Sequence, residues 1–219
     1  MKKIISFSLW GTNPVYNIGA IRNAELAKII YPDWVCRFYY GTSTLNETIE
    51  KLKTFDNVEL VDMGVEGDWT GMFWRFYPSS EPDVDVVIVR DCDSRLNQRE
   101  KDAVDEWLIS DKGFHIMRDH PAHGTEILGG MWGSKKGVVT EMKPLIEEYV
   151  KGDFWQVDQN FLREKIFPLI VNNNIAHDEF FGGKPFPTIR EHNQFVGQAF
   201  NKNDEMLYPE HVAHLYNHI

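Results

Sequence analysis

The sequence predicts an α/β protein in which helices flank a single central sheet that is doubly wound and mostly parallel. Strand-like and helical segments alternate along the first half of the chain, as they do in proteins of this class. Residues 84–90 form a nearly continuous apolar run, which is typical of a central strand covered on both faces. The length of 219 residues suits one such domain, and no repeat or linker-like tract divides the chain. We therefore expect a single domain over residues 1–219.

The expected elements follow from the spacing of apolar residues. Strands are expected where apolar, β-branched and aromatic residues are concentrated over short stretches, at residues 4–10, 34–40, 58–63, 84–90, 114–117 and 127–133. Helices are expected where apolar residues recur near helical spacing, at residues 17–30, 44–54, 98–109, 136–150 and 155–165, and from 72–77 up to Pro78. Beyond residue 175 the pattern is irregular, and residues 201–219 are expected to form a terminal helix or a lid.

The charge of the chain limits its partners. Asp and Glu number 33 and Lys and Arg 23, so the formal net charge is −10. A chain this acidic is a poor candidate for nucleic-acid binding, because that affinity comes from Lys and Arg on phosphates. The two cysteines cannot form a disulfide framework, and no run approaches the roughly 18 apolar residues of a membrane span. We expect a soluble, cytoplasmic protein with no nucleic-acid partner and no membrane span.

Two carboxylates follow the most strand-like segment of the chain. Ligands of open α/β sheets bind beyond the carboxyl ends of the strands, which is where Asp91 and Asp93 are expected. Carboxylates two residues apart can reach one divalent cation, and Mg²⁺ or Mn²⁺ binds well to one or two carboxylates plus phosphate oxygens. The alternative is that Asp93 or Ser94 caps the following helix while Asp91 favours its dipole. The residues alone leave both interpretations open.

The other candidate sites also have structural alternatives. Arg75 lies in an aromatic cluster, where it either reaches solvent or makes a two-pronged contact with a diphosphate or carboxylate. His115, His120 and His123 lie close together, but their segment lacks the cysteines or the His-Glu-x-x-His pattern of zinc sites and is consistent with a strand followed by a loop. Neither a dinucleotide-binding Gly-x-Gly-x-x-Gly nor a phosphate-binding loop occurs, which argues against dehydrogenases and P-loop enzymes.

Several segments, taken in order, resemble the GT-A glycosyltransferases, which use a nucleotide-sugar donor and a divalent metal. The strand that ends in the Asp-Cys-Asp of residues 91–93 is similar to their DXD motif. Residues 127–133 resemble the small-residue strand near the donor sugar, and residues 155–162 resemble a segment of the retaining members. Residues 177–186 are similar to a late His-x-x-Gly-x-x-Lys-Pro-Trp element, with one additional residue and Phe in place of Trp. The resemblance spans most of the chain.

The resemblance implies a GT-A-like domain and roles for individual residues. The residues expected to hold Mn²⁺ or Mg²⁺ are Asp91, Asp93 and His177. Asp158 and Gln159 are expected near the anomeric carbon as catalytic residues. The residues expected to bind the nucleotide-sugar, with Arg75 included for its residue type, are Trp10, Gly11, Arg75, Asp91, Gly129, Gly130 and Lys184.

The implied activity is metal-dependent transfer of a hexosyl or deoxyhexosyl group from a nucleoside-diphosphate sugar to a glycan or glycoprotein acceptor. UDP is the expected nucleotide, and retention is favoured over inversion. Residues up to about 95 would bind the nucleotide and residues from about 96 to 219 the acceptor. The small group that the chain resembles occurs in polysaccharide loci and in large algal viruses, where it glycosylates a capsid protein; a viral member would act in the host cytoplasm. The alternatives are a metal-dependent phosphohydrolase or nucleotidyltransferase, and a non-catalytic carbohydrate-binding module.

Overall fold

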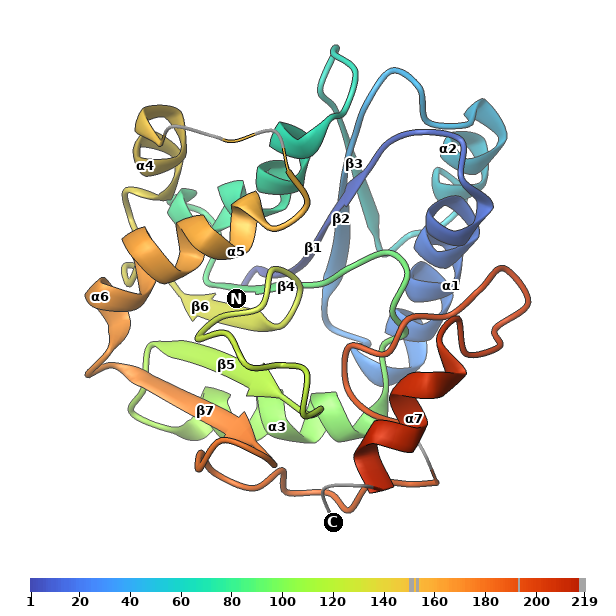
Figure 1. Ribbon diagram of the computed structural model, residues 1–219. Coiled ribbons are helices and arrows are strands. Elements are labelled where there is room, and N and C mark those ends of the chain that lie inside the picture. Colours follow the sequence, from blue (N-terminus) through green and yellow to red (C-terminus); the bar gives the residue numbers. More distant parts are fainter. Residues whose placement is uncertain (150–151, 153, 193, 217–219) are drawn as a thin grey trace.

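A sheet of seven strands, in the order β3-β2-β1-β4-β6-β5-β7, forms the centre of the molecule (Figure 1). The computed structural model describes residues 1–149, 152, 154–192 and 194–216. The strands are β1 (Lys3–Leu9), β2 (Val35–Tyr40), β3 (Val58–Asp62), β4 (Val86–Val89), β5 (Phe114–Arg118), β6 (Trp132–Lys135) and β7 (Asn174–Asp178). Neighbouring strands are parallel except at β6, which runs antiparallel to both β4 and β5. The predicted α/β class with a mostly parallel sheet is confirmed.

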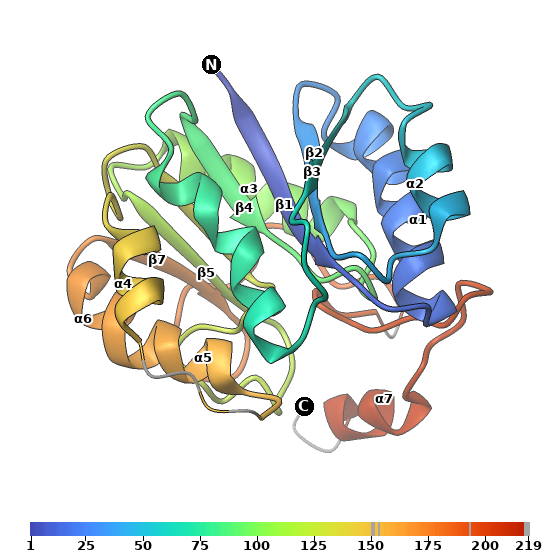
Figure 2. The same cartoon turned by 90° about the horizontal axis from the view of Figure 1, so that it is seen from above.

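Helices cover both faces of this sheet (Figure 2). The helices that contribute to one apolar core are α1 (Pro14–Ile30), α2 (Asn46–Leu52) and α3 (Gln98–Ile109). The elements that contribute to the opposite core are the 3₁₀ helix η1 (Trp69–Ser80), α4 (Met142–Glu148), α5 (Val157–Phe161), the π-helical turn η2 (Leu162–Ile166) and α6 (Phe167–Ile170). A last helix, α7 (Pro209–Tyr216), follows the irregular segment after β7. Within the described part of the chain, no helix has the length and apolar character needed to cross a membrane.

Strand β4 is buried on both faces, which accounts for its apolar sequence. Val87 and Val89 belong to the core under η1, whereas Val86 and Ile88 belong to the core under α1 and α3, because successive side chains of a strand point to opposite faces. None of the four is more than 4% exposed. Burying each such side chain stabilises the fold by about 1.5–3 kcal/mol. The carboxyl end of this fixed strand leads directly into residues 91–95.

Helix α1 begins earlier than the predicted start at residue 17. Asn13 caps it, since its Oδ1 accepts a hydrogen bond from the N–H of Val15 at 3.0 Å, and Pro14 occupies the first turn, where a missing N–H has no cost. The helix also approaches the loop after β4 so closely that a Cβ on Gly19 would collide with the carbonyl oxygen of Cys92. Glycine therefore permits the contact between α1 and this loop.

Some elements differ from the sequence expectations. Residues 127–131 are a loop ahead of β6 instead of part of a strand, and the helix predicted from residue 136 begins at Met142. The helix predicted at 155–165 is divided between α5 and η2 and continues as α6. The 3₁₀ helix η1 continues through Pro78, and α7 forms a helix within 201–219. The sequence does not predict β7, because a run of asparagines precedes it and is typical of a turn. Residues 150 and 217–219, which fall in predicted helices, lie outside the described residues.

Candidate functional site

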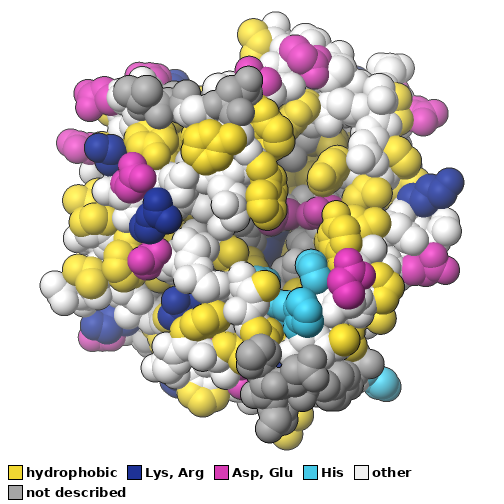
Figure 3. Space-filling view, in the orientation of Figure 1, with side chains coloured by type: hydrophobic (Ala, Val, Ile, Leu, Met, Phe, Trp, Pro, Cys, Tyr) yellow, Lys and Arg dark blue, Asp and Glu magenta, His cyan; other side chains and the backbone are white. Residues whose placement is uncertain are grey.

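The loop after β4 lies at the carboxyl edge of the sheet. The side chain of Asp91 is 41% exposed, and Asp93 is partly buried. The space-filling view shows a hollow near the middle of this face, with acidic side chains in it and histidine side chains beside it (Figure 3). This is the position at which open α/β sheets bind ligands.

Arg75 links this loop to the opposite side of the site. Its guanidinium comes from η1 and forms an ion pair with Asp91 and another with Asp158 of α5, whose Oδ2 lies 2.9 Å from Nη2. The side chains of Arg75 and Asp158 are only 8% and 3% exposed. Burial alone lowers the pKa of Arg75, but the two carboxylates outweigh it and raise this pKa above its usual value. Burial raises the pKa of Asp158, and Arg75 opposes that effect. The arginine therefore holds two carboxylates of distant segments together.

Two glycines close this site from the loop that leads into β6. A Cβ on Gly129 would collide with the carboxylate of Asp158, and a Cβ on Gly130 would collide with that of Asp91. Neither position has the positive φ that favours glycine for backbone reasons. The absence of a side chain thus serves the close approach of this loop to the two carboxylates.

The pKa of Asp93 is raised by its surroundings. Burial and, after it, the neighbouring Asp91 raise the pKa of Asp93 to about 7, although Arg75 and Arg95 act in the opposite direction. A pair of neighbouring carboxylates is a set of oxygen donors suited to a hard divalent cation. Within the described residues, no group of three or more His, Cys, Asp or Glu side chains could hold a metal ion. Mg²⁺ is commonly held by one or two carboxylates beside phosphate oxygens, and Asp91 and Asp93 are the carboxylates of this loop.

Tyr16 lies near this carboxylate pair, and Tyr208 lies near Tyr16. Burial, followed by the charges of Asp93 and Asp91, raises the pKa of Tyr16 to about 12, and Tyr208 is close enough to contribute. Both rings are exposed, at 41% and 46%. Sequence reasoning did not identify either one, since Tyr16 lies in the first turn of α1 and Tyr208 lies immediately ahead of α7.

Trp10 and Gly11 lie at the carboxyl end of β1, the neighbour of β4. The ring of Trp10 packs edge-to-face on Trp74 of η1 at 5.9 Å. Gly11 has a φ of +74°, and its N–H donates to Ser43 Oγ at 2.7 Å. The structure therefore places both residues on the sheet edge that carries Asp91, next to the helix that supplies Arg75. Gln159 follows Asp158 on α5, and its N–H donates to Asp158 Oδ1 at 2.8 Å.

The structure does not bring His177 and Lys184 together with Asp91 and Asp93. His177 is fully buried on β7, with its Nδ1 2.8 Å from His115 Nε2 and its Nε2 3.7 Å from Glu106 Oε2 of α3. The ammonium group of Lys184 pairs with the same Glu106. Because β6 and β5 separate β7 from β4, the two strands are about 14 Å apart. His177 points to the α3 face of the sheet, whereas Arg75 and Asp158 approach from the η1 face.

The remaining histidines form a separate cluster. His120 contacts His123, His211 and His214, with ring centroids 5.5, 5.4 and 6.4 Å apart. Both nitrogens of His120 are occupied, because Nδ1 accepts from the N–H of Ala122 and Nε2 lies 2.8 Å from the carbonyl oxygen of His211. The cluster therefore joins α7 to the loop after β5. It is separate from His115, which pairs with His177.

Comparison with known proteins supports this fold at low sequence identity. No protein-family model matches the chain, and no curated protein matches it. Among solved structures, it is similar to a glycosyltransferase involved in glycosylation of the major capsid of PBCV-1, with a TM-score of 0.54, 16% identity, and coverage of 81% of this chain and 82% of that one. It is also similar to residues 1–349 of TarS from S. aureus (TM-score 0.55, 12% identity, 80% and 58% coverage).

A third similar structure is the mannosyltransferase PcManGT from Pyrobaculum calidifontis, which was solved with GDP-Man and Mn²⁺ (TM-score 0.52, 11% identity, 81% and 54% coverage). The chain thus spans just over half of TarS 1–349 and of the mannosyltransferase. These similarities confirm that the chain has a GT-A-like fold.

Proposed function

We propose that the chain is a metal-dependent glycosyltransferase that moves a sugar from a nucleoside-diphosphate donor, with UDP as the expected nucleotide, to a glycan or glycoprotein acceptor. The observation that carries this proposal is the pair Asp91 and Asp93 at the carboxyl end of the central strand, joined through Arg75 to Asp158. A GT-A-like fold supports it, since a solved mannosyltransferase of similar fold holds GDP-Man and Mn²⁺.

Asp91 and Asp93 would hold Mn²⁺ or Mg²⁺ against the donor diphosphate. When bound, the cation acts as a Lewis acid that stabilises negative charge on the leaving diphosphate. A cation beside Asp93 also favours its ionised form, because its pKa is otherwise raised to about 7 by burial and by Asp91. Arg75 adds a fixed positive charge next to the same group, and its pairing with Asp158 holds it there without further reorganisation.

The donor sugar would lie over the two glycines. Gly129 and Gly130 bring bare backbone against Asp158 and Asp91, so the loop that would lie under the sugar packs directly on both carboxylates. We place Asp158 and Gln159 near the anomeric carbon and propose that the reaction retains the anomeric configuration. Residues up to about 95 would bind the nucleotide, and the acceptor would bind on the side formed by residues 96–219.

Nucleotide binding with and without metal tests this proposal directly. Thermal unfolding of the purified protein is measured with UDP, GDP or CDP, each in Mn²⁺ and in EDTA. We expect one diphosphate, UDP first, to raise Tm in Mn²⁺ only, and we expect Asp93→Ala to abolish that shift. Asp56→Ala is the matched control, since Asp56 is 82% exposed and pairs only with Lys28 among the described residues.

The other outcomes identify the alternatives. Release of pyrophosphate from a nucleoside triphosphate would indicate a nucleotidyltransferase, and sugar binding that persists in EDTA and in Asp93→Ala would indicate a carbohydrate-binding module. If a donor sugar is turned over, the NMR coupling of its anomeric proton in the product decides between retention and inversion. Inversion would remove Asp158 and Gln159 from their proposed role.

A further inference from the structure

We propose that Arg95 is a positioning residue that holds the loop of residues 91–94 in its metal-binding shape, and that Asp204 in turn holds Arg95. This inference rests on the proposed function. It adds a residue that neither the DXD pattern nor the fold assigns to the site, and it gives the C-terminal segment a part in metal binding.

The guanidinium of Arg95 contacts three backbone carbonyl groups of the loop. Its Nη1 lies 2.9 Å from the carbonyl oxygen of Ser94, and 3.4 Å from those of Cys92 and Asp93. The residue is only 9% exposed. Hydrogen bonds from a charged donor are stronger than neutral ones, so one side chain restrains three consecutive peptide groups of the loop. Its conformation therefore depends on where Arg95 is.

Asp204 and the segment around it fix the other edge of Arg95. Asp204 Oδ1 accepts from Nε of Arg95 at 2.9 Å, and Asn201 accepts from Nη2 at 3.3 Å through its carbonyl oxygen. The same segment touches the loop directly, because the N–H of Phe200 donates to the carbonyl oxygen of Asp93 at 2.8 Å. The C-terminal segment thus supports the metal loop both through Arg95 and by a backbone contact.

Helix α1 supports the loop from the opposite side, but with a neutral group. The Nδ2 of Asn23 donates to the carbonyl oxygen of Ser94 at 2.9 Å, and its Oδ1 accepts from the N–H of Leu96 at 3.1 Å. The same Nδ2 lies 3.5 Å from the carbonyl oxygen of Cys92, so Asn23 and Arg95 share two carbonyls of the loop. Arg95 differs from Asn23 in its charge and in its contact with the carbonyl oxygen of Asp93.

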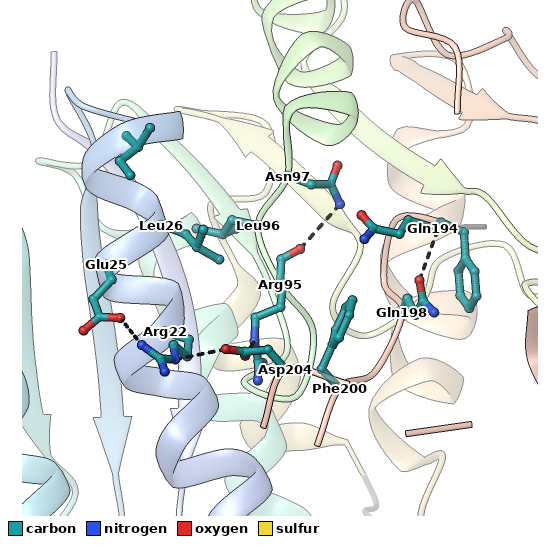
Figure 4. A pocket seen from close by; sticks show the side chains of 12 residues that line it. Arg22, Glu25, Leu26, Arg95, Leu96, Asn97, Gln194, Gln198, Phe200 and Asp204 are labelled. Carbon is teal, nitrogen blue, oxygen red and sulfur yellow. Dashed lines mark hydrogen bonds and ion pairs between the residues drawn. The ribbon is translucent and has the colours of Figure 1, made fainter. Parts of the chain in front are cut away.

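A cavity beside Arg95 explains why its position needs these polar contacts. The cavity has a volume of about 500 Å³ and lies between α1, residues 95–97 and the segment 194–204 (Figure 4). Arg95, Asp204 and Phe200 line it together. The guanidinium also packs on the ring of Phe200, with its carbon 5.5 Å from the ring centroid. Because the same side chain borders the cavity, Arg95 has room to turn once the charge of Asp204 is removed.

The test measures metal affinity, with activity only as a second readout. Free Mn²⁺ is titrated by electron paramagnetic resonance, with and without UDP, for the wild type and for Arg95→Gln, Arg95→Lys and Asp204→Asn. We expect Arg95→Gln to weaken Mn²⁺ binding by about 10- to 100-fold, as for other residues that orient metal ligands, and Arg95→Lys to recover part of it. Asparagine tolerates the left-handed backbone of Asp204, where φ is 61°, so Asp204→Asn removes the charge alone.

The matched control is Arg22→Gln. Arg22 pairs with the same Asp204 at 3.1 Å and with Glu25 at 2.8 Å, but among the described residues it donates no hydrogen bond to the loop. We expect its Mn²⁺ affinity to stay within about twofold of the wild type, which is the effect of a surface ion pair.

Three outcomes decide the matter. If Arg95→Gln folds and binds Mn²⁺ with wild-type affinity, while Asp93→Ala has lost Mn²⁺ binding, the positioning role of Arg95 is overturned and the proposed function stays intact. If Arg95→Gln does not fold, wild-type Mn²⁺ affinity in both Arg95→Lys and Asp204→Asn overturns the positioning role of Arg95 in the same way. If the wild type itself binds no Mn²⁺ in the presence of any nucleoside diphosphate, the proposed function fails and this inference fails with it.

Discussion

Replacing Arg75 with methionine is expected to destabilise the protein strongly at neutral pH and weakly in acid. The methionine keeps the apolar stem of the side chain but removes the charge that neutralises Asp158. Since the side chain of Asp158 is 3% exposed and its Oδ2 lies 2.9 Å from Arg75, the variant leaves a buried, unpaired carboxylate. Breaking such a pair costs about 3–5 kcal/mol. The contact with Asp91, which is 41% exposed, adds at most about 1 kcal/mol.

The pH dependence gives the sign of the effect. Without Arg75 the carboxyl pKa of Asp158 in the folded state rises further above its unfolded value of about 3.9. The loss of stability caused by Arg75→Met is therefore absent below about pH 3.9. It grows by about 1.4 kcal/mol per pH unit until the pH passes the pKa of Asp158 in the folded variant. At pH 4.5 it amounts to about 1 kcal/mol.

Urea unfolding followed by tryptophan fluorescence, at pH 7.5 and at pH 4.5, measures both quantities. For a chain of this length, a loss of 3 kcal/mol lowers Tm by on the order of 10 °C. The double variant Arg75→Met with Asp158→Asn removes both charges and is expected to recover most of the stability at pH 7.5. The reasoning is refuted if Arg75→Met loses less than about 1 kcal/mol at pH 7.5, if its loss is equal at the two pH values, or if the double variant recovers nothing.

Three further predictions concern the site and the core. Gly130→Ala is expected to weaken Mn²⁺ binding by about tenfold or more, because its Cβ would collide with the carboxylate of Asp91, whereas Gly124→Ala, whose Cβ has ordinary contacts at 3.8 Å, should titrate like the wild type. Burial lowers the pKa of His177 to about 4, so the folded state favours its neutral form. The stability that this preference contributes is complete above about pH 6.5 and is lost as the pH falls toward 4, with a loss of about 2 kcal/mol at pH 5. His177→Gln should thus show a smaller loss between pH 7 and pH 5 in urea unfolding; parallel pH profiles would contradict this. Both cysteines are buried, and burial raises the pKa of each thiol, so neither should react with a disulfide reagent at pH 8 until urea unfolds the protein.

The elements that the sequence predicts well are those in which local pattern and packing agree. The helix at 98–109 has the same bounds in the structure, since apolar spacing defines its body and Asn97 caps its start by accepting from the N–H of Glu100 at 2.9 Å. The buried strand within 84–90 is found because both of its faces are covered. These signals need no knowledge of distant residues.

The elements that the sequence misses depend on tertiary contacts. Residues 127–131 are apolar enough to suggest a strand, but the approach of Gly129 and Gly130 to two carboxylates holds them as a loop. β7 pairs with β5 over five register positions, beginning with Phe114 opposite Asn174, although its own sequence is a weak strand pattern. Tertiary contacts, and not propensity, therefore decide both segments.

The candidate site shows the same division. Arg75 contacts both Asp91 and Asp158, although 83 residues separate it from Asp158. The resemblance named the two aspartates as site residues and the residue type named Arg75, but neither predicted that the arginine would join them. His177 lies apart from these residues on β7, beside His115, because motif order does not say to which face of the sheet a strand residue points. Arg95 lies two positions beyond the DXD segment and was missed, because its role depends on a C-terminal segment whose position no local pattern predicts.

The contact of α1 with the loop after β4 was not predicted either, although the sequence contains a signal for it. Gly19 and Asn23 are four residues apart, which places them on one face of a helix. A glycine at that spacing from an asparagine indicates a helix face that meets backbone at close range, and both residues contact the loop after β4. Combining helical periodicity with residue size would have identified this face.

The strand order has a consequence for how the site is assembled during folding. The side of the sheet that ends at β4 comes entirely from residues 3–89, and the side that begins at β6 comes from residues 114–178. Within the sheet, the two halves meet along the β4–β6 seam, from Val86 opposite Lys135 to Val89 opposite Trp132, and outside it η1 packs on α4 and α5. Arg75 and Asp91 belong to the first half and Asp158 to the second. We therefore expect the N-terminal half to fold first during synthesis and the contact between Arg75 and Asp158 to form only when β6 pairs with β4, so that hydrogen-exchange protection of the β6 amides reports whether the candidate site has formed.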